Sequence, residues 1–320
     1  MDRGSENINY KGMHTKAIAI ATLVLLLECG LHSRAQPPGL QPLTQNKALT
    51  LSLKDTIVVD RDILIRHYFE FMGEVVTAMD SIKDYPISEY NLVHANPWIL
   101  DTLRSYDYYE SMKRGRFIYN QRALPVLKKG DRIRIPDRQE ALAIEDSLEH
   151  TLIDVNIPEY KLRIIVYDSV RYTLPVRVGR NTSRYLKTAG RRVSLRTPIG
   201  EGQIVRIERN PWFVNPVDGK VYHTTLRDDG QRTRMPLIPW LEPTIAGRRP
   251  GALIHPTTNF NTLGQALSNG CIGMSEGDAW LVYYHAPLGT KVQFRYDLKV
   301  VNEKGDTTVL KDIYHLQEDP

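Results

Sequence analysis

Alternating runs of apolar and polar residues constrain the fold of this 320-residue chain more than any other feature. One run covers residues 152–158, another covers 161–167, and residues 168–169 turn the chain into a third over 170–179. A period of two is typical of strands that bury one face. Short strands separated by turn residues predict a mostly β fold, a sandwich or a barrel-like domain, over about residues 151–295.

The preceding part of the chain has a helical pattern instead. Apolar residues recur at three- and four-residue spacing over residues 61–83, which predicts a helix. Pro97 suits the first turn of another helix, within a small region at 85–136. We therefore expect an α-rich N-terminal region over residues 61–150.

Residues 124–136 close that region with a Lys-Gly-Asp turn followed by alternating Ile and Arg. The pattern predicts a hairpin strand. It is similar to the final strand of LysM modules, which bind glycan chains, and a plain spacer domain is the alternative.

Two further elements are expected near the C-terminus. Residues 278–284 have a helical pattern, the one such stretch after residue 151. Residues 296–301 and 307–310 flank a polar turn, which predicts a β-hairpin tail over 296–320.

The N-terminus has the pattern of an export signal. Lys11 and Lys16 precede an apolar run at residues 17–27, which is too short to span a bilayer comfortably. Small residues at 33 and 35 predict cleavage before Gln36. We expect a signal peptide over residues 1–35, a linker over 36–60, and export to the periplasm or cell envelope. An uncleaved N-terminal anchor is the alternative.

The chain carries a small excess of basic residues. The formal net charge is +5, which fits a protein that works against an acidic polymer or surface. The sequence has no arginine-rich arm and no aromatic-basic signature, so we expect no nucleic-acid partner.

Cys271 is left as a lone thiol once cleavage removes Cys29. An exported chain with one thiol cannot close an internal disulfide, so the thiol needs another explanation. A nucleophile with a histidine base is the leading one. His255 lies sixteen positions earlier, after the apolar run 252–254, which predicts that it stands at a strand end.

Gly270 lets the backbone turn sharply before the thiol, so that amide N–H groups come close to the sulfur. Such amides hold the oxyanion of a tetrahedral intermediate. A zinc site is the competing use of Cys with His, but zinc usually takes three or four protein ligands. With one thiol available, we expect no metal and no cofactor.

The residues around the two candidates resemble the active-site signature of the L,D-transpeptidase (YkuD-type) catalytic domain family. That signature is a histidine, a loop, and then Ser/Thr-His-Gly-Cys, an apolar residue and Arg or Asn. His255 and the run 268–274 carry the resemblance here. Residues 196–200 are similar to the family's Thr-Pro-x-Gly turn, and 288–292 to its closing strand. The resemblance covers about residues 151–294.

The resemblance implies acyl transfer on the stem peptides of peptidoglycan. Cys271 would attack the carbonyl of an L-residue joined to a terminal D-residue, and an amine of a neighbouring stem would then take the acyl group. His255 would be the proton acceptor and donor, oriented by the Pro256 carbonyl. The oxyanion and substrate-binding region would comprise Ser268, Asn269 and Gly270.

Two positions depart from the family pattern. Asn269 replaces the family's second histidine, and it cannot shuttle a proton. Gly273 replaces the family's Arg or Asn. An L,D-carboxypeptidase acting on the same stems is one alternative, because motif residues do not separate transfer to an amine from transfer to water. A catalytically weakened cell-wall-binding protein is the other.

Other residues have two readings each. His223 either lines the cleft or lies on the surface, and Trp212 and Trp240 are either groove walls or core residues. A basic group either meets stem-peptide carboxylates or forms a solvated face; it comprises Arg184, Lys187, Arg191, Arg192 and Arg196.

Overall fold

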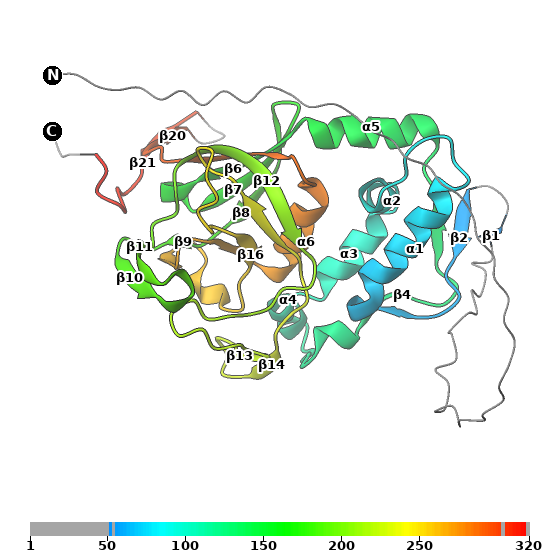
Figure 1. The fold of residues 1–320 in the computed structure, drawn as a ribbon, viewed down its shortest axis with the longest axis horizontal. Helices are drawn as coiled ribbons and strands as arrows, with labels where there is room; N and C mark the ends of the chain where they lie inside the picture. The colour runs from blue at the N-terminus through cyan, green and yellow to red at the C-terminus, as the bar shows by residue number, and fades with distance from the viewer. Residues whose placement is uncertain (1–50, 53–54, 302–304, 318–320) are drawn as a thin grey trace, which may run out of the picture. The chain divides into compact units, whose positions relative to one another are not determined.

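An eight-stranded sheet forms the centre of the computed structural model, which describes residues 51–52, 55–301 and 305–317 (Figure 1). The sheet curls into a nearly closed sandwich, so the mostly β fold predicted from the sequence is confirmed. The strand order is β18 (Ile272–Met274), β16 (Ile254–Pro256), β15 (Trp240–Pro243), β12 (Gly200–Glu208), β19 (Lys291–Arg295), β6 (Thr151–Asn156), β7 (Lys161–Val166) and β8 (Ser169–Pro175).

The described residues belong to one compact unit, which spans Ala48–Pro320. The predicted signal peptide and the linker as far as residue 50 lie outside the described residues. Among the residues that the structure describes, no helix has the length and apolar character needed to cross a membrane.

The sheet is mainly antiparallel, with two parallel pairings. β6, β7 and β8 form an antiparallel meander, as their alternating patterns predict. β19 pairs in parallel with β6, and β16 pairs in parallel with β18. Two-stranded sheets surround this core; they are β10 (Ser183–Leu186) with β11 (Arg191–Ser194), β13 (Thr224–Leu226) with β14 (Arg232–Arg234), β9 (Val178–Gly179) with β17 (Ala266–Ser268), and β20 (Lys299–Val301) with β21 (Thr307–Val309).

The predicted strand over residues 170–179 is wrong as one element. β8 ends at Pro175, and the chain then leaves the sheet to form β9. Pro175 has no N–H to continue a ladder, and the next amide, that of Val176, donates to the Tyr160 carbonyl at 2.9 Å. The predicted terminal hairpin is confirmed, because β20 and β21 pair in antiparallel fashion.

Helices dominate the described residues before 150, on the right of Figure 1. They are α1 (Tyr68–Asp80), α2 (Glu89–Ala95), α3 (Pro97–Ser105), α4 (Tyr108–Lys113) and α5 (Arg138–Glu149). Pro97 stands at the start of α3, as predicted. The helix predicted from residue 61 begins only at Tyr68, because β3 (Ile63–Leu64) pairs with β4 (Pro125–Leu127) instead.

The predicted hairpin at residues 124–136 is wrong in its pairing. The turn is present, with Gly130 at φ 92° and the Asp131 carboxylate accepting from the Lys128 amide at 2.7 Å. However, β4 pairs with β3, while β5 (Arg132–Arg134) pairs with β2 (Thr56–Val58). β4 and β5 therefore pair with strands distant in sequence and not with each other. β2 also pairs with β1 (Leu51–Ser52).

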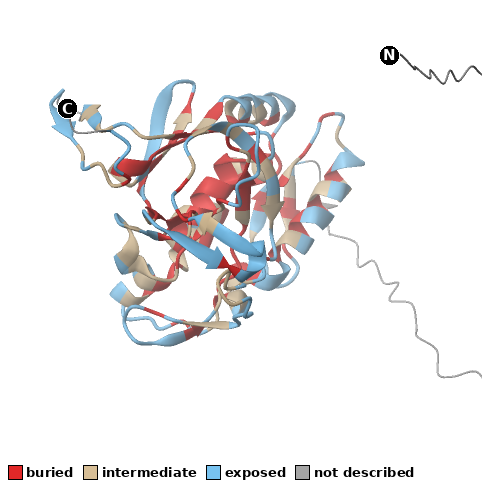
Figure 2. Ribbon diagram, turned by 60° about the vertical axis from the view of Figure 1, so that its left-hand side comes forward, coloured by how far each residue is buried: buried red, intermediate tan, exposed pale blue. Residues whose placement is uncertain are grey.

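Helix α6 (Glu276–His285) follows β18 directly and is buried on almost every face (Figure 2). Trp280, Tyr283 and Tyr284 are each 2% exposed or less. α6 packs against α3 on one side and β16 on the other, and the Tyr284 hydroxyl lies 2.6 Å from that of Tyr68 on α1. The helix therefore joins the N-terminal helices and the sheet into one hydrophobic core.

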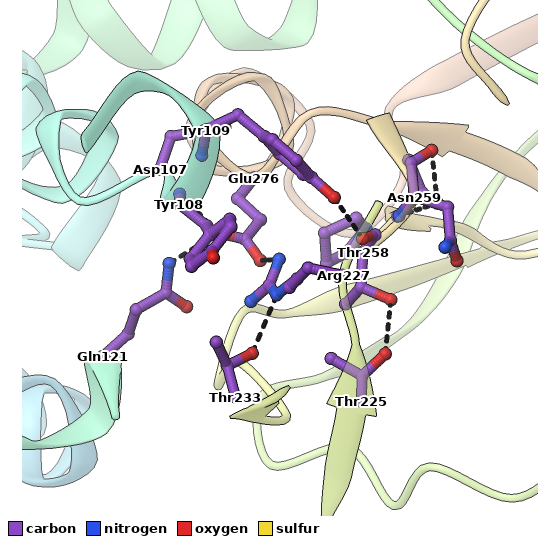
Figure 3. A network of polar contacts seen from close by, with 12 residues as sticks. Asp107, Tyr108, Tyr109, Gln121, Thr225, Arg227, Thr233, Thr258, Asn259 and Glu276 are labelled. Atoms are coloured by element: carbon purple, nitrogen blue, oxygen red, sulfur yellow. Dashed lines mark hydrogen bonds and ion pairs between the residues drawn. The ribbon is translucent and has the colours of Figure 1, made fainter. Parts of the chain in front are cut away.

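A buried ion pair fixes the start of α6 (Figure 3). Arg227 donates to Glu276 at 2.7 Å, and their side chains are 1% and 2% exposed. Glu276 also accepts from the Tyr108 amide at 2.9 Å and from the Gln121 side chain. Burial raises the pKa of Glu276, and the Arg227 charge opposes that rise. The pair ties the β13–β14 hairpin to α6 and α4.

We predict that Glu276→Gln destabilises the fold by about 3–5 kcal/mol, because it leaves the buried Arg227 charge uncompensated. Chemical denaturation measures the free energy of unfolding. Glu110→Gln is the matched control: Glu110 pairs with Lys113 at 2.6 Å, but both side chains are about half exposed or more, so its loss costs about 0–1 kcal/mol. Equal losses in the two variants would contradict the role given to the buried pair.

Candidate active site

The register of two short parallel strands brings the candidate thiol and base together. His255 on β16 is the Cα partner of Gly273 on β18, and Ile254 is the partner of Ile272. Cys271 directly precedes β18, two positions before Gly273. Because strand side chains alternate between faces, Cys271 and His255 face the same side. The sequence predicted His255 at a strand end, and it is the middle residue of the three-residue strand β16.

Both residues lie in a groove of about 1360 Å³. Five arginines line this groove, whereas none of its described lining residues is Asp or Glu. They are Arg177, Arg191, Arg192, Arg196 and Arg232. The groove therefore favours an anionic ligand.

His255 is held as a neutral base. Its Nδ1 donates to the Pro256 carbonyl at 2.7 Å, since a carbonyl oxygen can only accept. Nε2 of the neutral ring is then free to take a proton. Burial lowers the pKa of His255 to about 4, helped by the charge of Arg177 and opposed by the Pro256 carbonyl. The Trp240 ring lies beside the imidazole, with centroids 5.3 Å apart.

The surroundings of Cys271 favour the protonated thiol. The residue keeps a partly exposed surface, yet protein atoms crowd its sulfur, and this desolvation raises the pKa of the thiol. The Leu253 backbone and the Arg177 charge oppose the rise. Sγ donates to the Gly251 carbonyl at 3.8 Å. Within the described part of the chain no hydrogen bond joins Cys271 to His255. Burial lowers the pKa of His255 and raises that of Cys271, which favours the neutral form of each, and we call the two residues the neutral pair.

The turn before the thiol is held by side chains on both flanks. Gly270 has φ 109°, a region that favours glycine. Its N–H donates to Ser268 Oγ at 3.1 Å, and Ser268 donates to the Cys271 carbonyl at 2.6 Å. The Cys271 N–H has no acceptor among the described residues, and Asn269 lines the groove. The free amide at this turn is therefore that of Cys271, whereas the Gly270 amide is engaged.

The C-terminal tail supports the same turn. Thr197 donates to the Gly270 carbonyl at 3.1 Å and accepts from the Gly179 amide at 2.8 Å. The buried Tyr314 hydroxyl donates to the Gly179 carbonyl at 2.7 Å and accepts from the Thr197 amide at 3.0 Å. Sequence reasoning missed Tyr314, because it lies beyond the motif in a short polar tail.

The loop after β16 is held by α4, as Figure 3 shows. Tyr109 donates to the Thr258 carbonyl at 2.8 Å and accepts from the Asp228 amide at 3.1 Å. Asn259 donates to Asp228 at 3.1 Å. The N-terminal helices thus contact the segment that directly follows His255 and Pro256.

The residues with two readings divide between the groove and the surface. Trp240 lines the groove, whereas Trp212 is 70% exposed and does not. His223 is not a lining residue, although its neighbours are. Of the basic group, Arg191, Arg192 and Arg196 line the groove, and Arg184 and Lys187 do not.

Over residues 55–301 and 305–317, the structure has no group of three or more His, Cys, Asp and Glu side chains that could hold a metal ion.

We predict that Cys271 is alkylated slowly by iodoacetamide at neutral pH. Thiolate is the reactive form, and burial raises the thiol pKa, so the rate rises at higher pH than for the same protein unfolded in urea. Mass spectrometry measures the rate, with Cys29→Ser leaving one thiol in the chain. A midpoint at or below that of the unfolded protein would contradict the neutral pair.

Comparison with known proteins gives one family match. Residues 150–294 match the model of the L,D-transpeptidase catalytic domain, YkuD. No curated protein matches the chain.

Solved structures of L,D-transpeptidases are similar at low identity. One is the enzyme LdtMt1 in complex with imipenem, at 17% identity and a TM-score of 0.32, covering 46% of this chain and 59% of that one. The Mycobacterium smegmatis enzyme has 16% identity and a TM-score of 0.32, with 46% and 58% covered. The Xylanimonas cellulosilytica enzyme has 13% identity and a TM-score of 0.34, with 74% and 97% covered.

The chain thus spans about three fifths of the length of the first two of these structures. The resemblance predicted over residues 151–294 is confirmed by the family match, which covers the strands and the groove residues around Cys271 and His255. Residues 150–294 are accordingly similar to the YkuD family of L,D-transpeptidase catalytic domains.

Proposed function

We propose that this protein is an exported L,D-transpeptidase that cross-links peptidoglycan stem peptides through a thioacyl intermediate on Cys271. Two observations carry the proposal. Cys271 and His255 lie on the same face of the paired strands β16 and β18, and none of the described residues that line their groove is Asp or Glu. Cys271 and His255 lie in the segment that matches the family model.

In the first half-reaction, the Cys271 sulfur attacks the carbonyl of the L-residue before the terminal D-residue. The thiol proton passes to His255 Nε2, and the C–S bond forms. His255 then gives the proton to the leaving nitrogen as the C–N bond breaks, which releases the D-amino acid. Since the thiol is neutral before substrate arrives, proton transfer accompanies attack.

In the second half-reaction, an amine of a neighbouring stem attacks the thioester. His255 Nε2 takes the proton of the amine and returns it to the sulfur as the C–S bond breaks. A new amide bond joins the two stems, and the thiol is regenerated.

The oxyanion that forms in both halves needs donors that are already in place. The Cys271 N–H supplies one, since it has no acceptor among the described residues. The Gly270 N–H is the second, after it exchanges its bond to Ser268 for the substrate. Asn269 lines the groove and has a side-chain amide that can donate there.

The arginines suit the substrate class. Stem peptides carry free carboxylates, and Arg binds carboxylates in a planar, two-point geometry. Arg191 and Arg192 on β11, with Arg196 after it, face the groove that holds the thiol. The proposal needs no metal or cofactor, and it places the protein in the periplasm or cell envelope.

An L,D-carboxypeptidase is the alternative that this groove also accommodates, because it differs only in sending the thioester to water. We predict that the purified protein, given a tetrapeptide-stem muropeptide, releases D-alanine and forms a cross-linked dimer. Liquid chromatography with mass spectrometry identifies the products. Tripeptide without dimer would mean hydrolysis, and Cys271→Ser is the control that forms neither product. Intact substrate with folded wild-type protein would contradict both activities.

We predict that acylation by a carbapenem needs neutral His255, so that its rate falls only as the pH approaches about 4, the pKa of that side chain. His255→Gln should slow acylation by about 10²–10⁴-fold and remove this acid limb. Intact-mass kinetics measure the adduct, and circular dichroism checks the fold. An acid limb at the ordinary histidine pKa, about 6.5, would contradict the buried neutral base.

A further inference from the structure

We propose that Arg177 binds the free carboxylate at the end of the donor stem peptide, and that Gly273 is the residue that makes room for it. The inference rests on the proposed function. It names a specificity residue outside the motif that carries the family resemblance.

Gly273 stands between His255 and Arg177 in one row across the sheet. His255 is its partner on β16. From the other side Arg177 forms an antiparallel bridge to it. The Arg177 N–H donates to the Gly273 carbonyl at 2.8 Å, and the Gly273 N–H donates to the Arg177 carbonyl at 3.0 Å. Residues opposite one another share a face, so Arg177 lies on the side that holds Cys271 and His255.

The side chain of Arg177 occupies the space that a side chain at Gly273 would take. A Cβ atom added at Gly273 would lie 2.6 Å from Arg177 Nε and 2.9 Å from Arg177 Cγ. Both distances are shorter than van der Waals contact, so this position of Arg177 requires glycine at 273. The break between β8 and β9 is what brings Arg177 to this bridge.

Arg177 has no carboxylate partner in the part of the chain that the structure describes. Its Nη1 donates to Thr262 at 3.3 Å, the one hydrogen bond of this side chain to the described residues. Its Nε is buried without a partner. The buried Arg227, by contrast, pairs with the Glu276 carboxylate and donates from Nε to Thr233. The Arg177 guanidinium lines the groove and has N–H donors without an acceptor among the described residues, so it can bind an anionic ligand.

The charge of Arg177 affects the pKa values of both His255 and Cys271. It lowers the pKa of His255 and opposes the rise in the pKa of Cys271. In the proposed reaction, the leaving nitrogen receives its proton from His255, and the carboxylate of the released D-amino acid is one carbon from that nitrogen. A guanidinium beside His255 is therefore placed for this carboxylate.

The position of Arg177 also bears on the difference between Gly273 and the Arg or Asn of the family motif. The side chain of the Arg or Asn that the family motif has after the apolar residue is absent at Gly273, but Arg177 supplies a guanidinium there from a different segment. Gly273 with Arg177 is thus a matched pair and does not by itself indicate a weakened enzyme.

The experiment compares two donors, a tetrapeptide-stem muropeptide with a free C-terminal carboxylate and the same molecule with a C-terminal carboxamide. Release of D-alanine or D-alaninamide is followed by mass spectrometry. We expect the wild type to favour the carboxylate donor by about tenfold to a hundredfold, as for hydrogen bonds to a charged group. Arg177→Ala should lose this preference, and Arg177→Lys should recover part of it. Arg171→Ala, an exposed charge on β8 outside the groove, is the control.

Gly273→Ala provides a second variant that keeps Arg177. As a single substitution, Gly273→Ala should displace the guanidinium and lower the preference for the carboxylate donor. Added to Arg177→Ala, it should not change the preference further. Equal slowing of both donors by Arg177→Ala, or no slowing of either, overturns the inference. A wild type that cleaves both donors equally overturns this inference alone, whereas a wild type that cleaves neither overturns the proposed function. Thermal unfolding confirms that each variant is folded.

Discussion

The parallel pairing of β16 with β18 determines where every candidate catalytic group lies. It sets His255 opposite Gly273 and leaves Cys271 on the same face, although the two residues are sixteen positions apart in the sequence. The pairing covers only three residues on each strand. Strands this short contribute little on their own, so their register depends on what packs against them.

Helix α6 and its buried ion pair provide that support. α6 follows β18 directly and packs against β16, and Glu276 at its start pairs with Arg227 in the interior. The same network continues through Tyr109 to the Thr258 carbonyl, just after His255 (Figure 3). The N-terminal helices therefore contribute to the geometry of the site, although they lie outside the segment that matches the family. Their LysM-like role and the domain boundaries remain predictions.

Much of the fold could be predicted from local patterns. The meander of β6 and β7 has a clear period of two, and α3 begins at a proline. The errors arose where distant strands compete with near ones: β4 and β5 pair with β3 and β2, not with each other. Periodicity reports which residues face a core, but it does not report which strand lies alongside.

The site was predictable in part for the same reason. Cys271 and His255 lie in a short motif, and the orienting role proposed for Pro256 matches its hydrogen bond to the imidazole. Arg177 and Tyr314 come from other segments, and only the fold brings them to the groove. The most direct test of the account is the intact mass of the protein, quenched in acid soon after mixing with a tetrapeptide-stem muropeptide. We predict an added tripeptide-stem acyl group on Cys271, whereas folded protein that releases D-alanine with no adduct on Cys271 would contradict a thioacyl intermediate.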